Sequence, residues 1–106
     1  METIGLEASI KEAALAVLGS RCRTIFVVSS ENVLIGSVTE GDLVRAFLLG
    51  VNLGSSVRHV MNHNPIYSEP SFTKRMGRDL MRAHGQSAIP VIDASRKLLS
   101  ILKQTD

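Results

Sequence analysis

Two residues three positions apart, Thr39 and Asp42, combine a hydroxyl and a carboxylate at the predicted start of a helix. A helix N-terminus presents free backbone N–H groups and partial positive charge, which suits a phosphate group. A carboxylate does not bind phosphate, but it accepts hydrogen bonds from ribose hydroxyls, as the acidic residue of dinucleotide folds does. The pair therefore suits a nucleotide, with ribose on Asp42 and phosphate near Thr39. The same residues also fit a plain helix cap with an acid favoured by the helix dipole.

Other reactive side chains suit a structural role better. Cys22 lies between two arginines, Arg21 and Arg23, but no histidine motif is nearby, and the arginines also fit solvated charges at a strand edge. The histidines lack metal-ligand spacing, so no metal site is expected. No nucleophile–base pair is visible, so this chain is not expected to be an enzyme. The histidines in question are His59, His63 and His84. The basic face formed by Lys74, Arg78 and Arg82 is likewise more typical of a solvated helix face than of a polyanion-binding patch.

The elements around Thr39 and Asp42 read as strand, turn, strand and helix. An apolar, β-branched run at 25–28 is followed by a polar turn and a second strand over 33–38, in which Gly36 permits a close approach. Earlier in the chain, Ser9 and Glu12 form a predicted capping box, with Ile10, Ala13, Ala14, Val17 and Leu18 as the apolar face of that helix. With a short strand at 3–4, the first half reads β-α-β-β-α.

The second half repeats this order. We expect a short helix near 57–61, a brief strand over 64–68, a helix opened by Ser71 or Thr73, and strands at 88–92 and 97–102. The predicted apolar positions of that helix are Phe72, Met76, Leu80 and Ala83. Ile4 and Ile66, like Ser9 and Ser71, are 62 residues apart, whereas Ile25 and Ile89, like Asp42 and Asp106, are 64 apart. This internal repeat predicts two similar units that share a core.

The run Leu34-Ile35-Gly36-Ser37-Val38-Thr39, then Asp42-Leu43 after two residues, resembles the core of a CBS domain. The two halves together resemble a tandem CBS pair, or Bateman module. The resemblance implies an α/β (α+β) fold of two β-α-β-β-α repeats about a pseudo-two-fold axis, at 1–50 and 64–106, joined by a linker at 51–63. The second repeat stops at Asp106 and lacks its last helix, which predicts more chain in the parent protein.

The resemblance also implies a purine nucleotide such as AMP, ADP or ATP in the cleft between the repeats. It assigns to this site the following residues: Thr39, Asp42, Arg23, Thr24, Asn64, Pro65, Ile66, Ser87, Ala88 and Ile89. A second, weaker site at the pseudo-symmetric position would use Thr3, Ile4, Lys103 and Asp106, with Lys103 in place of the threonine. The run 39–46 is similar to CBS pairs N-terminal to sugar-phosphate nucleotidyltransferases, from which Glu40 and Val44 depart.

The bulk composition is that of an ordinary globular chain. It has 106 residues, 44% of them apolar, and a net charge of +2, which is too small to argue for DNA binding. Neither a membrane-spanning run nor a signal peptide is visible, and a single cysteine fits a reducing cytoplasm. The leading hypothesis is a non-catalytic nucleotide sensor, expected to be a homodimer, that regulates an attached catalytic domain. The alternative is a structural homodimerisation module with a degenerate nucleotide site.

Overall fold

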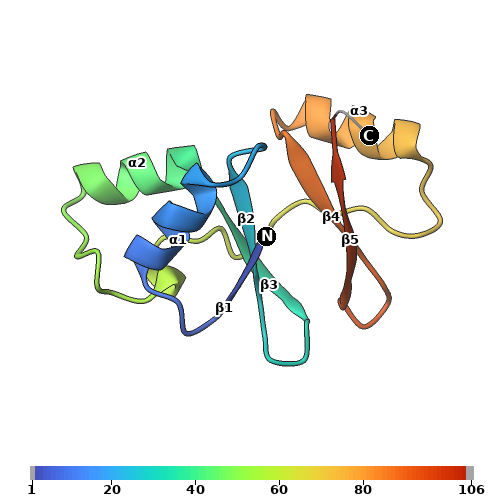
Figure 1. Ribbon diagram of the computed structural model, residues 1–106. Helices are drawn as coiled ribbons and strands as arrows, with labels where there is room; N and C mark the ends of the chain where they lie inside the picture. Colours follow the sequence, from blue (N-terminus) through green and yellow to red (C-terminus); the bar gives the residue numbers. More distant parts are fainter. Residues whose placement is uncertain (1, 105–106) are drawn as a thin grey trace.

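The computed structural model describes residues 2–104, which form two similar units placed side by side (Figure 1). The first unit contains strands β1 (Thr3–Gly5), β2 (Thr24–Val28) and β3 (Leu34–Thr39) and helices α1 (Ile10–Leu18) and α2 (Glu40–Leu48). The 3₁₀ helix η1 (Val57–His59) follows in the linker. The second unit contains helix α3 (Lys74–Ala83) and strands β4 (Ala88–Ile92) and β5 (Leu98–Lys103).

The first unit is a three-stranded sheet covered on one face by α1 and α2 (Figure 1). Strand β2 is central, parallel to β1 and antiparallel to β3. The predicted capping box is confirmed, since Ser9 Oγ accepts from the Glu12 N–H and the Glu12 carboxylate accepts from the Ser9 N–H. Ile10, Ala13 and Val17 are buried as expected, but Leu18 is 64% exposed and does not belong to the apolar face.

Equivalent residues of the two units differ in number by a constant 64. Strands β4 and β5 pair in the register of β2 and β3, with Ile25 opposite Val38 in one unit and Ile89 opposite Leu102 in the other. The helices obey the same offset, because α1 begins after Ser9 and α3 begins after Thr73. The predicted offset of 62 for the helices is therefore wrong: Ser71 and Phe72 lie before the helix.

The buried face of α3 also differs from the predicted one. Met76 is 46% exposed, while Gly77 and Met81, the counterparts of Ala13 and Val17, are buried. A β-carbon at Gly77 would lie 2.3 Å from Leu102 Cδ2, so the glycine lets α3 approach β5 closely. Gly77 weakens the helix by its propensity, but its missing side chain leaves room for the Leu102 side chain against α3.

The predicted strand over 64–68 is reduced to a single parallel bridge between Ser68 and Val91. In the first unit the Phe26 N–H donates to the Glu2 carbonyl beside β1. The counterpart of Phe26 is Pro90, which has no N–H to donate to the corresponding position at Ile66. The segment consequently joins β4 only at Ser68, whose N–H donates to the Pro90 carbonyl and whose carbonyl accepts from Ile92.

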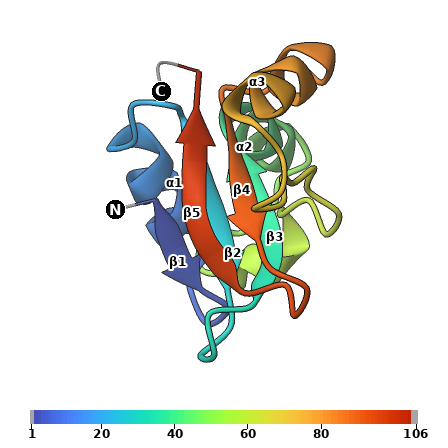
Figure 2. The same ribbon diagram turned by 90° about the vertical axis from the view of Figure 1, so that its right-hand side faces the viewer.

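The two units meet along their sheets, which overlap when viewed from the side of the second unit (Figure 2). Phe26 and Leu34 of the first unit pack with Ala88 and Ile92 of the second in a shared buried cluster. At the hairpin turns, Leu34 N–H donates to the Arg96 carbonyl and Leu98 N–H donates to the Asn32 carbonyl. These two bonds are equivalent, because Leu98 corresponds to Leu34 and Arg96 to Asn32 under the 64-residue offset. The bridge between Val33 and Lys97 joins two residues that correspond to each other. The pseudo-two-fold axis therefore passes through that bridge.

Candidate functional site

Thr39 and Asp42 form the junction between β3 and α2. Thr39 Oγ1 accepts from the Asp42 N–H at 3.3 Å, and Asp42 Oδ2 accepts from the Thr39 N–H at 2.8 Å and from the Thr39 hydroxyl at 3.1 Å. The other carboxylate oxygen, Oδ1, accepts from Arg45 Nη1 at 3.1 Å. The Asp42 side chain is only 12% exposed. The helix-cap interpretation is thus confirmed, and a ligand at this carboxylate would share it with Thr39 and Arg45.

The largest cavity described, of about 680 Å³, lies between the two units and has Thr39 and Asp42 in its wall. Its volume is within the range of small-molecule sites, roughly 300–1,000 Å³. The first unit contributes Phe26, Ser37, Thr39, Asp42 and Arg45, and the remaining lining residues are Val60, Met61, Asn62, Asn64, Pro65, Ile66, His84, Gln86 and Ala88. One wall therefore comes from each repeat, as the sequence predicts for a cleft between them.

The linker reaches the cavity because it pairs with β3. Ser37 and Asn62 exchange two backbone hydrogen bonds, of 3.0 and 2.8 Å, which lay the chain along the strand before it crosses to the second unit. Gly36 permits this contact, because a β-carbon there would lie 2.7 Å from the Asn62 carbonyl oxygen. The close approach predicted at Gly36 is confirmed, and its partner is the linker that carries Asn64 and Pro65 into the cavity wall.

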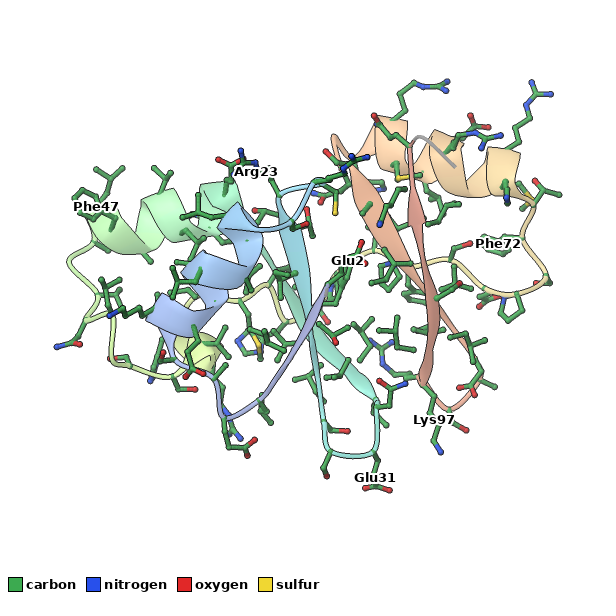
Figure 3. The ribbon with its side chains drawn as sticks, viewed as in Figure 1. Glu2, Arg23, Glu31, Phe47, Phe72 and Lys97 are labelled. Atoms are coloured by element: carbon green, nitrogen blue, oxygen red, sulfur yellow. The ribbon has the colours of Figure 1, made fainter. Side chains whose placement is uncertain are left out.

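A smaller cavity of about 250 Å³ adjoins the first at the N-terminus of α2. Thr39 and Gln86 line both cavities, and the smaller one is completed by Cys22, Arg23, Thr24, Glu40, Gly41, Gly85 and Ser87. Arg23 has a φ of 53°, a left-handed conformation that is uncommon outside glycine. Its side chain lies beside the start of α2 (Figure 3), with Nε 3.8 Å from Glu40 Oε1, and Nη1 donates to the Leu18 carbonyl.

Nine of the ten residues predicted for the main site line these two cavities. Thr39, Asp42, Asn64, Pro65, Ile66 and Ala88 lie in the larger one, and Arg23, Thr24 and Ser87 lie in the smaller one. Ile89 is fully buried against Met81 and Leu102 and lines neither.

Eight further residues line the larger cavity and were not among the predicted site residues: Phe26, Ser37, Arg45, Val60, Met61, Asn62, His84 and Gln86. Arg45 had a usable signal, since it follows Asp42 by three positions on a helix and such residues share a face. The others carry no such local signal: Phe26 lies in the cluster shared by the two units, and Asn62 is placed by its backbone pairing with Ser37.

At the pseudo-symmetric position an ion pair replaces the polar cap. Lys103, the counterpart of Thr39, places Nζ 2.5 Å from the Glu2 carboxylate, and both side chains are partly buried at 35% and 28% exposure. Thr3 and Ile4 of the predicted second site are held in β1, paired with Phe26 and Val27. Asp106 lies outside the described residues. Lys103 is therefore already bound to an acid where the predicted second site needs a group for phosphate.

Within residues 2–104, no three histidine, cysteine, aspartate or glutamate side chains are grouped so that they could hold a metal ion. Over the same part of the chain, none of the helices has both the length and the apolar character needed to cross a membrane.

Comparisons with known proteins agree with this architecture. The profile of the CBS domain matches residues 1–49 and again residues 57–106. The CBS domain pair of protein MJ0100, solved with 5′-methylthioadenosine and S-adenosyl-L-methionine, has a TM-score of 0.81 at 21% identity, covering 97% of this chain and 81% of that one. CBSX2, solved with AMP, has a TM-score of 0.83 at 21% identity and covers 99% and 82%.

Among curated proteins, a homoserine O-acetyltransferase of Methanocorpusculum labreanum is 30% identical over 95 residues, or 90% of this chain and 19% of the relative. The chain spans about a fifth of the length of the first curated relatives that it matches. The family profile covers both halves, and the single 64-residue offset relates the two units strand by strand. The chain therefore belongs to the CBS domain family and is a tandem pair of CBS repeats.

Proposed function

We propose that this chain is a non-catalytic regulatory module that binds an adenosine-containing ligand in the cavity between its two repeats. The observation that supports this most directly is the cavity of about 680 Å³, whose walls bring Thr39 and Asp42 together with Pro65 and Ala88. A cavity of this size in which several polar groups converge is typical of a small-molecule site. The ligands of MJ0100 and CBSX2, both CBS proteins, support an adenosine compound.

In this proposal the nucleoside occupies the larger cavity, with its ribose hydroxyls on Asp42, and any phosphate extends into the smaller cavity. Thr39 and Gln86 line both cavities and would contact the ligand where it passes between them. Asp42 Oδ1 is bonded only to Arg45 among the contacts described, and the Arg45 side chain is 65% exposed, so ribose can compete for this oxygen at modest cost.

Regulation follows from the position of the cavity between two units. A ligand that contacts both walls binds best to one relative arrangement of the repeats, and that difference in affinity is what can bias an attached or associated domain. A sugar-phosphate nucleotidyltransferase is one candidate for that domain. A homoserine O-acetyltransferase, named among the relatives, is another.

The test is calorimetric titration of the 106-residue chain with AMP, 5′-methylthioadenosine and S-adenosylmethionine. Asp42→Asn is the chosen variant because its amide oxygen can still cap α2 while the charge that holds ribose is lost. Asp79→Asn is the matched control, since Asp79 is 58% exposed on α3 and pairs with Arg82. We expect binding by wild type and by the control, and a loss of about tenfold or more in Asp42→Asn. Equal affinities for all three proteins would refute the proposal.

A second candidate function is homodimerisation, favoured by an apolar surface on α2. Val44, Phe47, Leu48 and Leu49 are 56–79% exposed, and Phe47 projects away from the body of the molecule (Figure 3). Grouped apolar side chains of this kind mark interaction sites. Sedimentation of Phe47→Asp, compared with Leu99→Asp on β5, tests it: a dimer that dissociates only in the first variant supports this surface, and a wild-type monomer excludes it.

A further inference from the structure

The ionisable side chains in the walls of the two joined cavities come as two oppositely charged pairs. Asp42 lies 3.1 Å from Arg45 in the larger cavity, and Glu40 lies 3.8 Å from Arg23 in the smaller one. Among the described lining residues, Cys22 and His84 are the other ionisable groups. Each arginine therefore already has an acid beside it, and the two acids and two arginines cancel in formal charge.

The smaller cavity is where this balance matters. It contains the N-terminus of α2, whose partial positive charge would otherwise favour an anion. The carboxylates of Glu40 and Asp42, in the first turn of α2, already interact with this partial positive charge. Arg23 is held in place from two sides, because its Nη1 donates to the Leu18 carbonyl while its Nε faces Glu40. A phosphate entering here would have to compete with Glu40 for Arg23.

We infer that the Arg23–Glu40 pair selects the ligand by its phosphate charge, in favour of adenosine compounds with one phosphate or none. A diphosphate or triphosphate would bring further negative charge into the cavity that Glu40 lines, and like charges repel. Specificity achieved by a repulsive group of this kind is a common device in binding sites. The inference rests on the proposed function, since it concerns which ligand the same cavity accepts.

The experiment is calorimetric titration of the 106-residue chain with adenosine, AMP and ATP, each with and without Mg²⁺. In wild type we expect ATP to bind about tenfold more weakly than AMP. In Glu40→Gln we expect ATP to gain about threefold to tenfold, because the pair is half exposed and partly screened, while uncharged adenosine is unchanged. Glu31→Gln is the matched control: it removes the same charge from the exposed β2–β3 turn (Figure 3) and should change nothing.

The outcomes separate the two proposals. ATP binding as tightly as AMP in wild type, or Glu40→Gln behaving like Glu31→Gln, would overturn the charge selection while leaving the adenosine site in place. Absence of binding by all three compounds would overturn the proposed function, and this inference with it. Thermal melting of each variant without ligand checks that it is folded. Glu40 is exposed but lies in the first turn of α2, so Glu40→Gln should lower Tm slightly through the lost interaction with the helix dipole.

Discussion

Replacing Asp42 by alanine should destabilise the protein even when no ligand is present. The carboxylate accepts from the Thr39 N–H, the Thr39 hydroxyl and Arg45, and its side chain is 12% exposed. Loss of a cap of this kind costs about 1 kcal/mol, and loss of an acid from the first turn adds about 0.3–1 kcal/mol. The exposed end of the Arg45 pair contributes little. We therefore expect Asp42→Ala to lower the free energy of unfolding by about 1.3–2 kcal/mol.

Asp42→Asn separates this structural role from a role in binding. The amide oxygen can still accept from the Thr39 N–H, so we expect a loss of at most about 1 kcal/mol, from the dipole and the Arg45 pair. For a chain of this size, 1 kcal/mol corresponds to about 4–8 °C in Tm. Urea unfolding followed by far-UV circular dichroism measures both variants. An Asp42→Ala protein as stable as wild type would refute the capping geometry, and equal losses in the two variants would show that charge rather than hydrogen bonding sets the effect.

Three further changes test the packing that supports the cavity. Phe26→Ala removes a fully buried ring from the cluster shared by the repeats and should cost about 3–5 kcal/mol in urea unfolding, with one transition for both repeats; two separate transitions would contradict a shared core. Gly36→Ala places a methyl group against the Asn62 carbonyl and should lower the free energy of unfolding, measured by thermal melting, by about 1–3 kcal/mol. No change would mean that the linker moves away at no cost. Asn32→Ala and Asn32→Gly both lose the hydrogen bond from Asn32 Nδ2 to the Leu98 carbonyl, but only alanine is strained at the φ of 63°. By chemical denaturation, Asn32→Ala should therefore cost about 1–2 kcal/mol more than Asn32→Gly.

The sequence predicted most of the element order because each element carries its own local signal. Ser9 with Glu12 and Thr39 with Asp42 mark helix starts through bonds made within one turn, and both capping boxes are present in the structure. The buried strands at 25–28 and 88–92 are continuous apolar runs. Such runs can be recognised without a hydrophobic period of two or 3.6 residues.

The errors arose where a local signal was duplicated or overridden. Of the two predicted helix starts, Ser71 and Thr73, the second is the N-cap, since Thr73 Oγ1 accepts from the Met76 N–H; the pairing of Ser9 with Ser71 was wrong. The strand expected over 64–68 failed because its neighbour Pro90 has no N–H, a property of a residue far along the chain. The predicted cavity wall was incomplete because its other members carry no local motif; Asn62, for example, is placed by backbone pairing with Ser37 of β3.

Pro90, the counterpart of Phe26, interrupts the predicted strand over 64–68, and this affects how the cavity is connected to the two repeats. Between Asn62, bonded to Ser37 of the first repeat, and Ser68, bonded to Pro90 and Ile92 of the second, the chain runs as a tether anchored at both ends. Asn64, Pro65 and Ile66 lie on this tether and form part of the lining. A ligand that displaced these three residues would act on the first repeat through Asn62 and on the second repeat through Ser68. Because Pro90 has no amide hydrogen, the chain before Ser68 is not paired as an edge strand, and a ligand that displaced it would act on both repeats at once.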